Sequence, residues 1–391
     1  MKILFYAPMK APDDPIASGD RLVARNLAAA LERRGHDVVL VSRFRSYDRG
    51  SACRQDRLGA IGQRLAQRLL RRLERSPDRP DLWFTYHLYH KAPDLLGPYV
   101  ATALGIPYVV AEASVAGKQR SGPFERFYRE SVAALGRADL VLTLNPNDAA
   151  GVRPHLRPDA PMADLPPFID ASPLLAATGD RGGARARLAR RHGLDPSRPW
   201  LVTAAMMRSD QKLASYRVLA EAVSRLDADA FELLIAGAGP AEAEVRAAFA
   251  EKGVDATFLG EVPGADMPAL LSACDLFVWP AVKEAYGMAL IEAQASGLPV
   301  VAGASAGVAG VVGHGQTGLL PRQGDADAFA GAVRALLDPG RRRAFGEAAR
   351  QRVVDHHDIA SAAGRLDHLL GETLRRFRAS RAPSRSIERT V

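Results

Sequence analysis

The chain has 391 residues, of which 47% are hydrophobic and 25% charged, and its formal net charge is +8. This composition excludes a wholly disordered or collagen-like chain, and the length is sufficient for two or three globular domains. No apolar run approaches the roughly 20 residues of a membrane-spanning helix, and Cys53 and Cys274 are too few for a disulfide framework or a zinc cluster. Because no signal-peptide cleavage pattern follows residues 1–8, we expect a cytoplasmic protein.

The net charge is concentrated in two segments. Residues 43–79 contain eleven arginines and four acidic residues, and residues 375–391 contain six arginines and one glutamate. The rest of the chain is slightly acidic. An anionic partner would therefore be attracted to these two segments rather than to the whole surface.

In the first half of the chain, apolar runs alternate with longer amphipathic stretches, which is typical of repeated β-α units and a parallel sheet. Helices are predicted over 18–34, with Gly35 as a stop signal, and over 123–137. Strands are predicted at 2–8, 37–42, 81–86, 107–113 and 139–145.

The same alternation restarts after a proline-rich passage and a glycine-rich stretch at 179–183. It predicts strands at 200–205, 231–237, 256–262, 275–280 and 299–304. We therefore predict two similar α/β domains joined near residues 170–185. The chain from residue 325 onward is predicted to be helical and to end in a basic, disordered tail at 379–391.

The most informative segment is 284–301, EAYGMALIEAQASGLPVV, which follows a predicted buried strand. A helix is expected to begin near Gly287, so the backbone amides of Gly287, Met288 and Ala289 would lie at its N-terminus. Unpaired N–H groups and the helix dipole favour a phosphate there, and Gly287 has no Cβ to obstruct it. The carboxylate of Glu292, about a turn and a half further on, could accept hydrogen bonds from sugar hydroxyls.

A pair of acidic residues such as Glu284 and Glu292 is usually part of a solvated helix. Here the pair brackets a helix that opens with glycine at the carboxyl end of a strand, which is where α/β folds bind ligands. The arrangement therefore favours a functional site.

The Glu284-x7-Glu292 pair in this segment resembles the signature of glycosyltransferase family 4, the retaining group 1 enzymes with the GT-B fold. Residues 306–320 resemble the family's next loop and strand, and residues 265–280 resemble the preceding helix and strand. The resemblance is strong over 199–340. It implies an α/β fold of two Rossmann-like domains whose parallel sheets face each other across a cleft.

The resemblance also implies an organisation and an activity. It implies an N-terminal acceptor domain at 1–175, a nucleotide-sugar-binding domain at 184–355, and a helix around 358–378 that packs back on the first domain. The implied reaction is a retaining transfer of a sugar from a nucleotide sugar to a hydroxyl of a sugar, glycan or lipid-linked acceptor. No cofactor and no structural metal are implied.

In the family, the glutamate matching Glu292 binds the nucleotide ribose, and the one matching Glu284 contacts the donor sugar. The resemblance further assigns donor binding to the start of the helix, at Gly287, Met288, Ala289 and Leu290.

Arg208 and Lys212 lie in the predicted strand-to-helix loop after 200–205. Two cations there could neutralise a diphosphate as its bond to the sugar breaks, and the resemblance assigns them to donor binding and catalysis. The family has glycines beside this Arg and this Lys, whereas this chain has Met207 and Leu213. Two ordinary surface cations are the less favoured interpretation, because the chain has only seven lysines.

The first domain carries fewer of the family's residues. Gly19 remains of a typical pair of loop glycines that let the donor phosphate approach. Where many relatives have a donor-contacting histidine, this chain has Glu112. Either Glu112 makes a polar contact in its place, or His87 or His90 reaches the same site; an ordinary polar loop at 87–93 is equally consistent with the sequence.

Residues 57–75 predict an amphipathic helix with Leu58, Ile61, Leu65, Leu69 and Leu73 on one face and arginines over much of the rest. This pattern suits a surface helix that binds anionic lipid or a lipid-linked acceptor, at the inner face of the cytoplasmic membrane. It equally suits a helix packed on the core with a solvated arginine side. Without aromatic interleaving or a known module, we expect no nucleic-acid partner.

Two other functions are compatible with the same fold. A GT-B nucleotide-sugar epimerase would need no acceptor, but the spacing of Glu284 and Glu292 matches the transferases better. A non-catalytic donor-binding or scaffolding protein would keep the second domain and lose first-domain residues. The presence of Arg208 and Lys212 beside the two glutamates favours retained donor binding.

Overall fold

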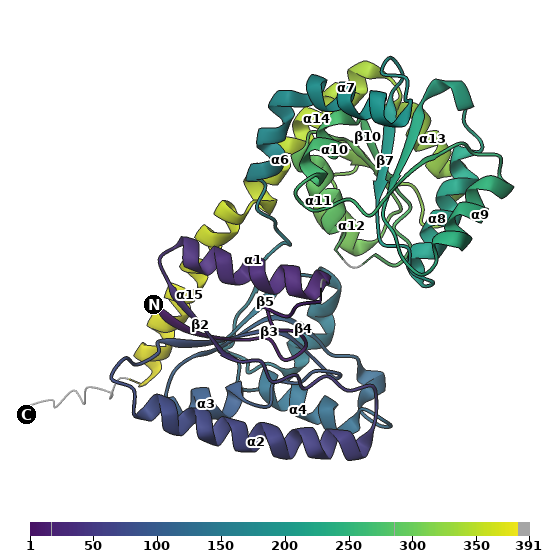
Figure 1. Cartoon of the computed structure of the whole chain (residues 1–391). Coiled ribbons are helices and arrows are strands. Elements are labelled where there is room, and N and C mark those ends of the chain that lie inside the picture. The colour runs from purple at the N-terminus through teal and green to yellow at the C-terminus, as the bar shows by residue number, and fades with distance from the viewer. Residues whose placement is uncertain (17, 285, 382–391) are drawn as a thin grey trace, which may run out of the picture. The chain divides into compact units, whose positions relative to one another are not determined.

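The computed structural model describes residues 1–16, 18–284 and 286–381. The chain divides into two compact units, one formed by Met1–Leu165 with the residues from Ala362 onward, and the other by Pro166–Ser361. Within the described residues, each unit contains one parallel sheet of six strands with helices packed on it (Figure 1).

The sheet of the first unit has the order β2-β1-β3-β4-β5-β6. Its central strands are almost continuously buried, as expected when helices cover both faces of a parallel sheet. The strands are β1 (Lys2–Tyr6), β2 (Asp37–Ser42), β3 (Leu82–Tyr89), β4 (Tyr108–Ser114), β5 (Leu140–Thr143) and β6 (Met162–Asp164).

The helices of the first unit are α1 (Gly19–Arg33), α2 (Ala52–Glu74), α3 (Gly97–Leu104), α4 (Glu125–Leu135), α5 (Ala149–Val152) and α15 (Ile359–Arg381), whose residues from Ala362 belong to this unit. Figure 1 shows α2, α3 and α4 on one face of the sheet and α1 on the other. The Ser18 hydroxyl caps α1 by accepting from the Arg21 amide. An ion pair between Arg34 and Asp367, at 3.2 Å, ties α15 to the end of α1.

The sheet of the second unit has the order β12-β11-β10-β7-β8-β9. The strands are β7 (Trp200–Ala204), β8 (Glu232–Ala236), β9 (Thr257–Gly260), β10 (Leu276–Trp279), β11 (Val300–Ala302) and β12 (Gly318–Leu319). The helices are α6 (Ser172–Ala177), α7 (Arg181–His192), α8 (Gln211–Val223), α9 (Glu242–Glu251), α10 (Met267–Ala273), α11 (Met288–Ala295), α12 (Ala306–Val311), α13 (Ala326–Leu336) and α14 (Pro339–Arg352).

The second unit begins earlier than the predicted join at 170–185. Ile169, Ala171 and Leu174 are buried in its core together with Ala184, so the chain from Pro166 belongs to this unit. The join was placed too late in the chain because α6 and α7 pack on α10 instead of forming a linker.

Three short elements also differ from the expectations. β6 lies within the proline-rich passage, where no strand was predicted. Residues 306–311 form α12 where a loop was expected, because the Ser305 hydroxyl caps a helix by accepting from the Val308 amide. Residues 379–381 belong to α15 and were wrongly assigned to a disordered tail; the rest of that predicted tail lies outside the described residues.

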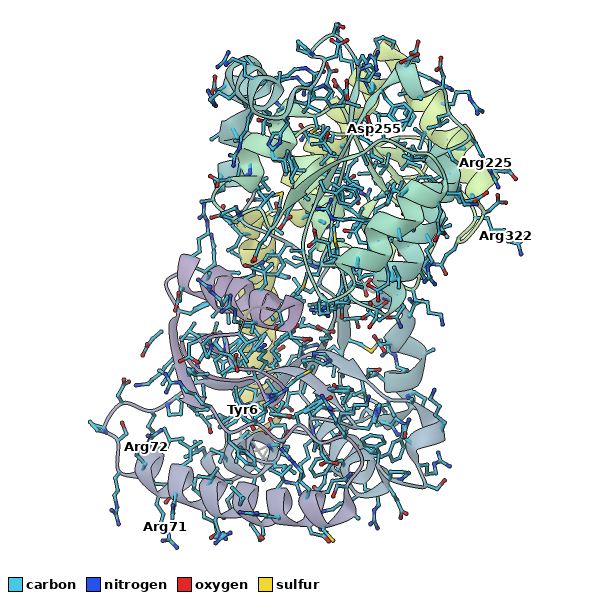
Figure 2. The ribbon with its side chains drawn as sticks, turned by 45° about the vertical axis from the view of Figure 1, so that its right-hand side comes forward. Tyr6, Arg71, Arg72, Arg225, Asp255 and Arg322 are labelled. Carbon is cyan, nitrogen blue, oxygen red and sulfur yellow. The ribbon has the colours of Figure 1, made fainter. Side chains whose placement is uncertain are left out.

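The predicted basic helix is present as α2. The residues that it buries are not those of the predicted leucine face. Gly62, Ala66, Leu69 and Leu73 are buried, whereas Leu58, Ile61 and Leu65 are half-buried. Gly62 allows the close approach, since a Cβ there would stand 2.7 Å from the Leu95 Cβ. The arginines lie on the solvent side, as Arg71 and Arg72 illustrate (Figure 2). Over the described residues, every helix is too short or too polar to cross a membrane.

A partly buried charge network joins α7 to the start of two strands of the second sheet. The Asp275 carboxylate accepts from Arg181 at 2.7 Å, from Arg185 at 2.9 Å and from the Trp200 backbone amide at 2.8 Å. The Arg185 guanidinium also lies 4.1 Å from the centroid of the Trp200 ring. Removing Asp275 leaves the largely buried Arg185 without its carboxylate partner.

We therefore expect Asp275→Ala to lower the free energy of unfolding by about 3 kcal/mol. The matched control is Asp180→Ala, which removes an exposed ion pair with Arg187 beside the same helix and is expected to change stability by less than about 1 kcal/mol. Urea unfolding followed by circular dichroism measures both values, and equal values for the two variants would contradict the role of the Asp275 network.

Candidate functional site

The carboxyl ends of the strands of the second sheet carry the predicted site residues. Because β7, β8, β10 and β11 are parallel, the loops that follow them all leave at one edge of the sheet. The loop after β7 carries Arg208 and leads to Lys212 in α8, and the loop after β10 carries Glu284 and leads to α11 with Glu292. Four predicted residues thus come to one edge from two neighbouring strands.

Two glycines that sequence reasoning missed hold the loop after β7 in place. Gly237 and Gly239 have φ of 143° and 155°, and a Cβ on them would lie 2.0 Å from the Ala205 carbonyl oxygen and 2.3 Å from that of Met207. The Met207 amide donates to the Ala238 carbonyl at 3.0 Å. The usable signal was Gly-x-Gly-Pro at the end of the predicted strand 231–237.

Lys212 and Glu284 form the central ion pair of the site. The Lys212 Nζ donates to the Glu284 Oε2 at 2.5 Å, and the Trp279 Nε1 donates to the same oxygen at 3.3 Å. The ammonium also lies 5.2 Å from the Trp279 ring centroid, within range of a cation–π interaction. Asp210 caps α8 by accepting from the Lys212 amide at 2.9 Å. The pair therefore has a fixed position while both side chains keep some solvent exposure.

The loop that carries Glu284 is strained and is held by its neighbours. Ala281 and Lys283 have φ of 52° and 53°, which costs a non-glycine residue roughly 1–2 kcal/mol each. The Ser215 hydroxyl accepts from the Val282 amide at 3.0 Å, and the Ser305 hydroxyl donates to the Glu284 carbonyl at 3.3 Å. Strain retained by surrounding contacts is typical of functional loops.

Helix α11 begins where the sequence predicted. Gly287 is its N-cap and has φ of 68°, in the left-handed region that favours glycine. Among the described residues, no backbone carbonyl accepts from the amides of Met288 and Ala289, so both can donate to an anion. The Leu290 amide donates to the Gly287 carbonyl at 2.8 Å. Leu290 was predicted to bind the donor, but its backbone amide is already paired within the chain.

Glu292 lies further along α11 with its carboxyl group largely removed from solvent. Burial raises its pKa from 4.5 to about 7. Within residues 1–16, 18–284 and 286–381, its carboxylate has no hydrogen-bond or ion-pair partner. A carboxylate in this state gains most from a ligand that donates hydrogen bonds, such as a pair of sugar hydroxyls.

Arg208 is placed differently from Lys212. Its side chain is exposed, and its Nη2 lies 3.1 Å from the Met206 sulfur. Among the described residues it forms no ion pair, so its guanidinium is open to an anion at this edge. The structure therefore brings Lys212 and Glu284 together and leaves Arg208 at the rim.

In the first unit, His87 and Glu112 lie opposite each other on β3 and β4, between the pairs Tyr86–Ala111 and Leu88–Ala113. Both have left-handed backbones, with φ of 64° and 61°. The His87 Nε2 lies 4.0 Å from the Glu112 Oε1, and its Nδ1 lies 3.0 Å from the carboxylate of Asp20, near the start of α1. The two residues that the sequence offered as alternatives therefore meet in one cluster, with Asp20 as a third member that it did not predict.

This cluster holds His87 toward its charged form. Burial opposes protonation of the ring, but the carboxylates of Glu112 and Asp20 outweigh it, and the pKa of His87 is raised above its ordinary 6.5. Burial also works against ionised Asp20, yet the hydrogen bond from His87 leaves the pKa of Asp20 lowered.

The two remaining first-unit candidates are His90 and Gly19. The His90 ring contacts the ring of Phe124, with centroids 5.0 Å apart. A Cβ on Gly19 would meet nothing within 4 Å, so close packing does not require glycine there. Across the described parts of the chain, no group of three His, Cys, Asp or Glu side chains is arranged to hold a metal ion.

Comparisons with known proteins identify the family and the fold. The family described as Glycosyl transferases group 1 matches residues 203–352. The chain is 30% identical over 284 residues to 2-deoxystreptamine glucosyltransferase of Streptomyces kanamyceticus, covering 69% of this chain and 72% of that protein.

Over 289 residues, the chain is 31% identical to GDP-mannose-dependent alpha-(1-6)-phosphatidylinositol monomannoside mannosyltransferase of Mycolicibacterium smegmatis, covering 71% and 73% of the two chains. Its fold is similar to that of sucrose-phosphate synthase from Thermosynechococcus elongatus, with a TM-score of 0.70 at 22% identity over 96% of this chain and 100% of that one. The two Rossmann-like units therefore form a GT-B fold, as the sequence predicted.

The raised pKa of Glu292 predicts a dependence of stability on pH. Between its unfolded pKa of 4.5 and its folded pKa of about 7, the folded state binds more protons, so the free energy of unfolding falls as the pH rises. Glu292→Gln removes this loss, and we expect it to be more stable than the natural chain by about 3 kcal/mol at pH 8 and about equal at pH 4.5.

Urea unfolding at the two pH values measures this difference, with Glu251→Gln on the exposed end of α9 as the control that should show none. A Glu292→Gln variant with no stability gain at pH 8 would contradict the burial of an uncompensated carboxylate.

Proposed function

Since this chain belongs to the glycosyl transferases group 1 family and is therefore a glycosyltransferase, we propose that it uses a nucleotide-sugar donor and retains the anomeric configuration of the transferred sugar. The acceptor is a hydroxyl of a sugar, glycan or lipid-linked molecule. The observation that carries the donor assignment is the meeting of three features at one sheet edge: the Lys212–Glu284 pair, the first amides of α11, and the Glu292 carboxylate. Among the described residues, neither the Met288 and Ala289 amides nor this carboxylate has a hydrogen-bond partner.

Each part of the donor has a matching group in this proposal. The ribose hydroxyls donate to Glu292, and the diphosphate accepts from the amides of Met288 and Ala289. Lys212 and Arg208 supply positive charge beside the diphosphate, and Glu284 contacts the sugar. The proposal assigns charge neutralisation to these groups and requires no metal ligand or cofactor.

The reaction then exchanges one bond for another. The bond between the anomeric carbon and the diphosphate oxygen breaks, and a bond to the acceptor oxygen forms on the same face of the sugar. The acceptor proton passes to the leaving phosphate. Positive charge fixed at the second unit stabilises the departing diphosphate, which is the electrostatic part of catalysis.

The proposal assigns His87, Glu112 and Asp20 of the first unit to catalysis and to positioning. Two left-handed residues on adjacent strands, with the His87 imidazole beside the carboxylates of Glu112 and Asp20, support a functional reason for the strain. His87 and Glu112 are the polar groups assigned to the sugar, and Asp20 orients the imidazole. Gly19 stays a proposed point of approach for the donor phosphate.

The two other functions considered from the sequence are not favoured. Relatives that match more than two thirds of the chain are named as transferases, whereas an epimerase or a scaffold would need no acceptor chemistry.

We further propose that the arginine side of α2 binds an anionic membrane surface and brings the enzyme to a lipid-linked acceptor. The support is the row of exposed arginines, whose attraction to anionic lipid is about 1 kcal/mol for each residue near the surface.

Incubation with a panel of UDP-, GDP- and ADP-sugars tests the donor proposal. We expect hydrolysis or transfer with one nucleotide class, and product spectra by NMR that show the donor's anomeric configuration. Activity with none of these donors would favour the scaffold, and a product of inverted configuration would contradict retention.

Calorimetry with the matching nucleoside diphosphate tests the site. We expect Glu292→Ala to weaken binding by a factor of at least one hundred, because two hydroxyl hydrogen bonds to a charged group are lost. Glu251→Ala, on the exposed end of α9, is the control that keeps the natural affinity. Unchanged binding by Glu292→Ala would rule out this assignment.

Cosedimentation with phosphatidylglycerol vesicles tests the membrane proposal. Replacing Arg71 and Arg72 with glutamine is expected to weaken binding about tenfold or more. Replacing Arg190 and Arg191, the adjacent arginines in the last turn of α7, is the matched control and should have little effect. The membrane surface is refuted if the two double variants lose binding equally, or if the natural chain does not bind.

A further inference from the structure

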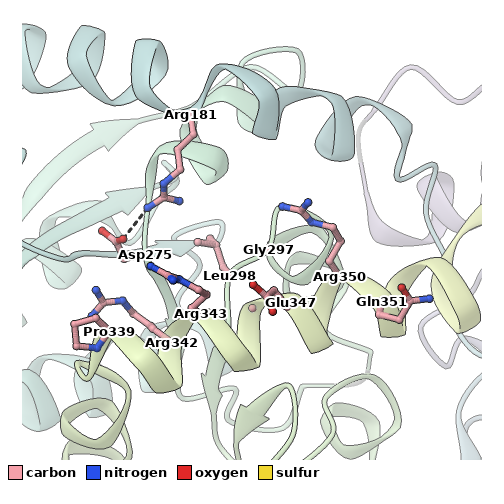
Figure 3. A pocket seen from close by; sticks show the side chains of 11 residues that line it. Arg181, Asp275, Gly297, Leu298, Pro339, Arg342, Arg343, Glu347, Arg350 and Gln351 are labelled. Atoms are coloured by element: carbon pink, nitrogen blue, oxygen red, sulfur yellow. Dashed lines mark hydrogen bonds and ion pairs between the residues drawn. The ribbon is translucent and has the colours of Figure 1, made fainter.

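A polar pocket lies in the second unit, at the edge of its sheet opposite the candidate donor site. It has a volume of about 550 Å³ and lies between α14, the start of α7 and the loop after α11 (Figure 3). Its lining residues Asp275 and Leu298 precede β10 and β11, whereas the donor-site residues follow the strands. The two sites therefore do not share a lining residue.

The pocket is rich in arginine. Arg342, Arg343 and Arg350 reach it from α14, and Arg181 reaches it from α7 (Figure 3). Residues spaced by seven, such as Arg343 and Arg350, lie on the same side of a helix. Gly346 allows this helix to approach closely, since a Cβ there would lie 2.3 Å from the Gly297 carbonyl oxygen. In this position, the basic side of α14 forms one wall of the cavity.

Most of this positive charge is not neutralised by the protein. Asp275 is already paired with Arg181 and Arg185. In the described parts of the chain, no carboxylate lies within 4.0 Å of the guanidinium groups of Arg342, Arg343 or Arg350.

Arg342 lies among other charged groups. It is half-buried and donates to the Leu337 carbonyl at 2.7 Å. Burial is the main cause that lowers its pKa; the charges of Arg181 and Arg185 lower it further, whereas Asp275 and Asp338 oppose the shift. An added anion would relieve this repulsion among like charges.

Two further features select the kind of anion. Guanidinium groups bind phosphate through paired N–H donors, and a cavity of this volume suits a small molecule. Glu347 also lines the pocket, and its carboxylate can accept from hydroxyls. Among the described lining residues none is aromatic.

We propose that this pocket binds a soluble phosphorylated sugar or polyol, with its phosphate on Arg342, Arg343 and Arg350 and its hydroxyls on Glu347. The site is separate from the proposed donor site and does not rest on the proposed function.

Calorimetry on the full chain with glucose 6-phosphate, inorganic phosphate and glucose tests the proposal. We expect glucose 6-phosphate to bind more tightly than inorganic phosphate and glucose not to bind. The double variant Arg343→Gln/Arg350→Gln should lose at least tenfold in affinity for glucose 6-phosphate. Both side chains are exposed, so the variant should keep the natural melting temperature; Arg343→Gln alone serves if the double variant does not fold.

Matched variants separate the pocket from general electrostatics. Arg341→Gln removes an exposed arginine of the same helix that does not line the pocket, and it should leave the affinity unchanged. Glu347→Gln should weaken binding of glucose 6-phosphate and spare that of inorganic phosphate. Glu292→Ala, in the proposed donor site, should spare both.

The proposal is overturned if neither phosphate binds, or if Arg341→Gln loses as much affinity as the double variant. Loss of binding in Glu292→Ala alone would move the phosphate to the donor site and also overturn it. Vesicle binding that is lost in Arg343→Gln/Arg350→Gln and kept in the Arg71/Arg72 variant, without binding of either soluble phosphate, would overturn the proposal and identify a lipid surface at this pocket.

Discussion

The common direction of the strands is the constraint on which the second unit depends. Four parallel strands deliver their loops to one edge, so residues 72 positions apart in the chain, Lys212 and Glu284, meet at 2.5 Å. The loops are then fixed by close packing, as at Gly239, where any side chain would collide with the Met207 carbonyl. The ion pair is therefore a consequence of strand order, and local sequence around either residue would not produce it alone.

The positions of the central strands along the chain and the start of α11 could be predicted because they depend on local patterns. Apolar runs mark the central strands, and Gly287 marks the N-cap. The partners of Lys212 could not be predicted, because Trp279 and Glu284 reach it only through the sheet. For the same reason His87 and Glu112 were treated as alternatives: no sequence pattern reports that they face each other across β3 and β4. The start of the second unit at Pro166 was missed because burial of Ile169 and Leu174 is set by tertiary contacts.

Helix α11 connects the two edges of the second unit. Its first turn presents the amides of Met288 and Ala289 to the candidate donor site, and its end leads to Gly297 and Leu298 in the arginine pocket. A helix of eight residues spans about 12 Å. Gly346 of α14 packs closely against the Gly297 carbonyl, just beyond the end of this helix.

The proposed functional groups of both units are unfavourable for the stability of the folded chain. The Glu292 carboxyl group is largely removed from solvent and has no partner among the described residues, and Ala281, Lys283, His87 and Glu112 hold left-handed backbones. None of these features improves packing, and each costs on the order of 1 kcal/mol or more. They persist because the central strands of both sheets are almost wholly buried and supply stability that does not depend on the sheet edges. A bound donor would reverse part of this cost, since its hydroxyls offer Glu292 the hydrogen bonds that the folded chain withholds. In the proposed site, Glu292 is thus a group that weakens the folded chain and whose free energy a ligand can lower.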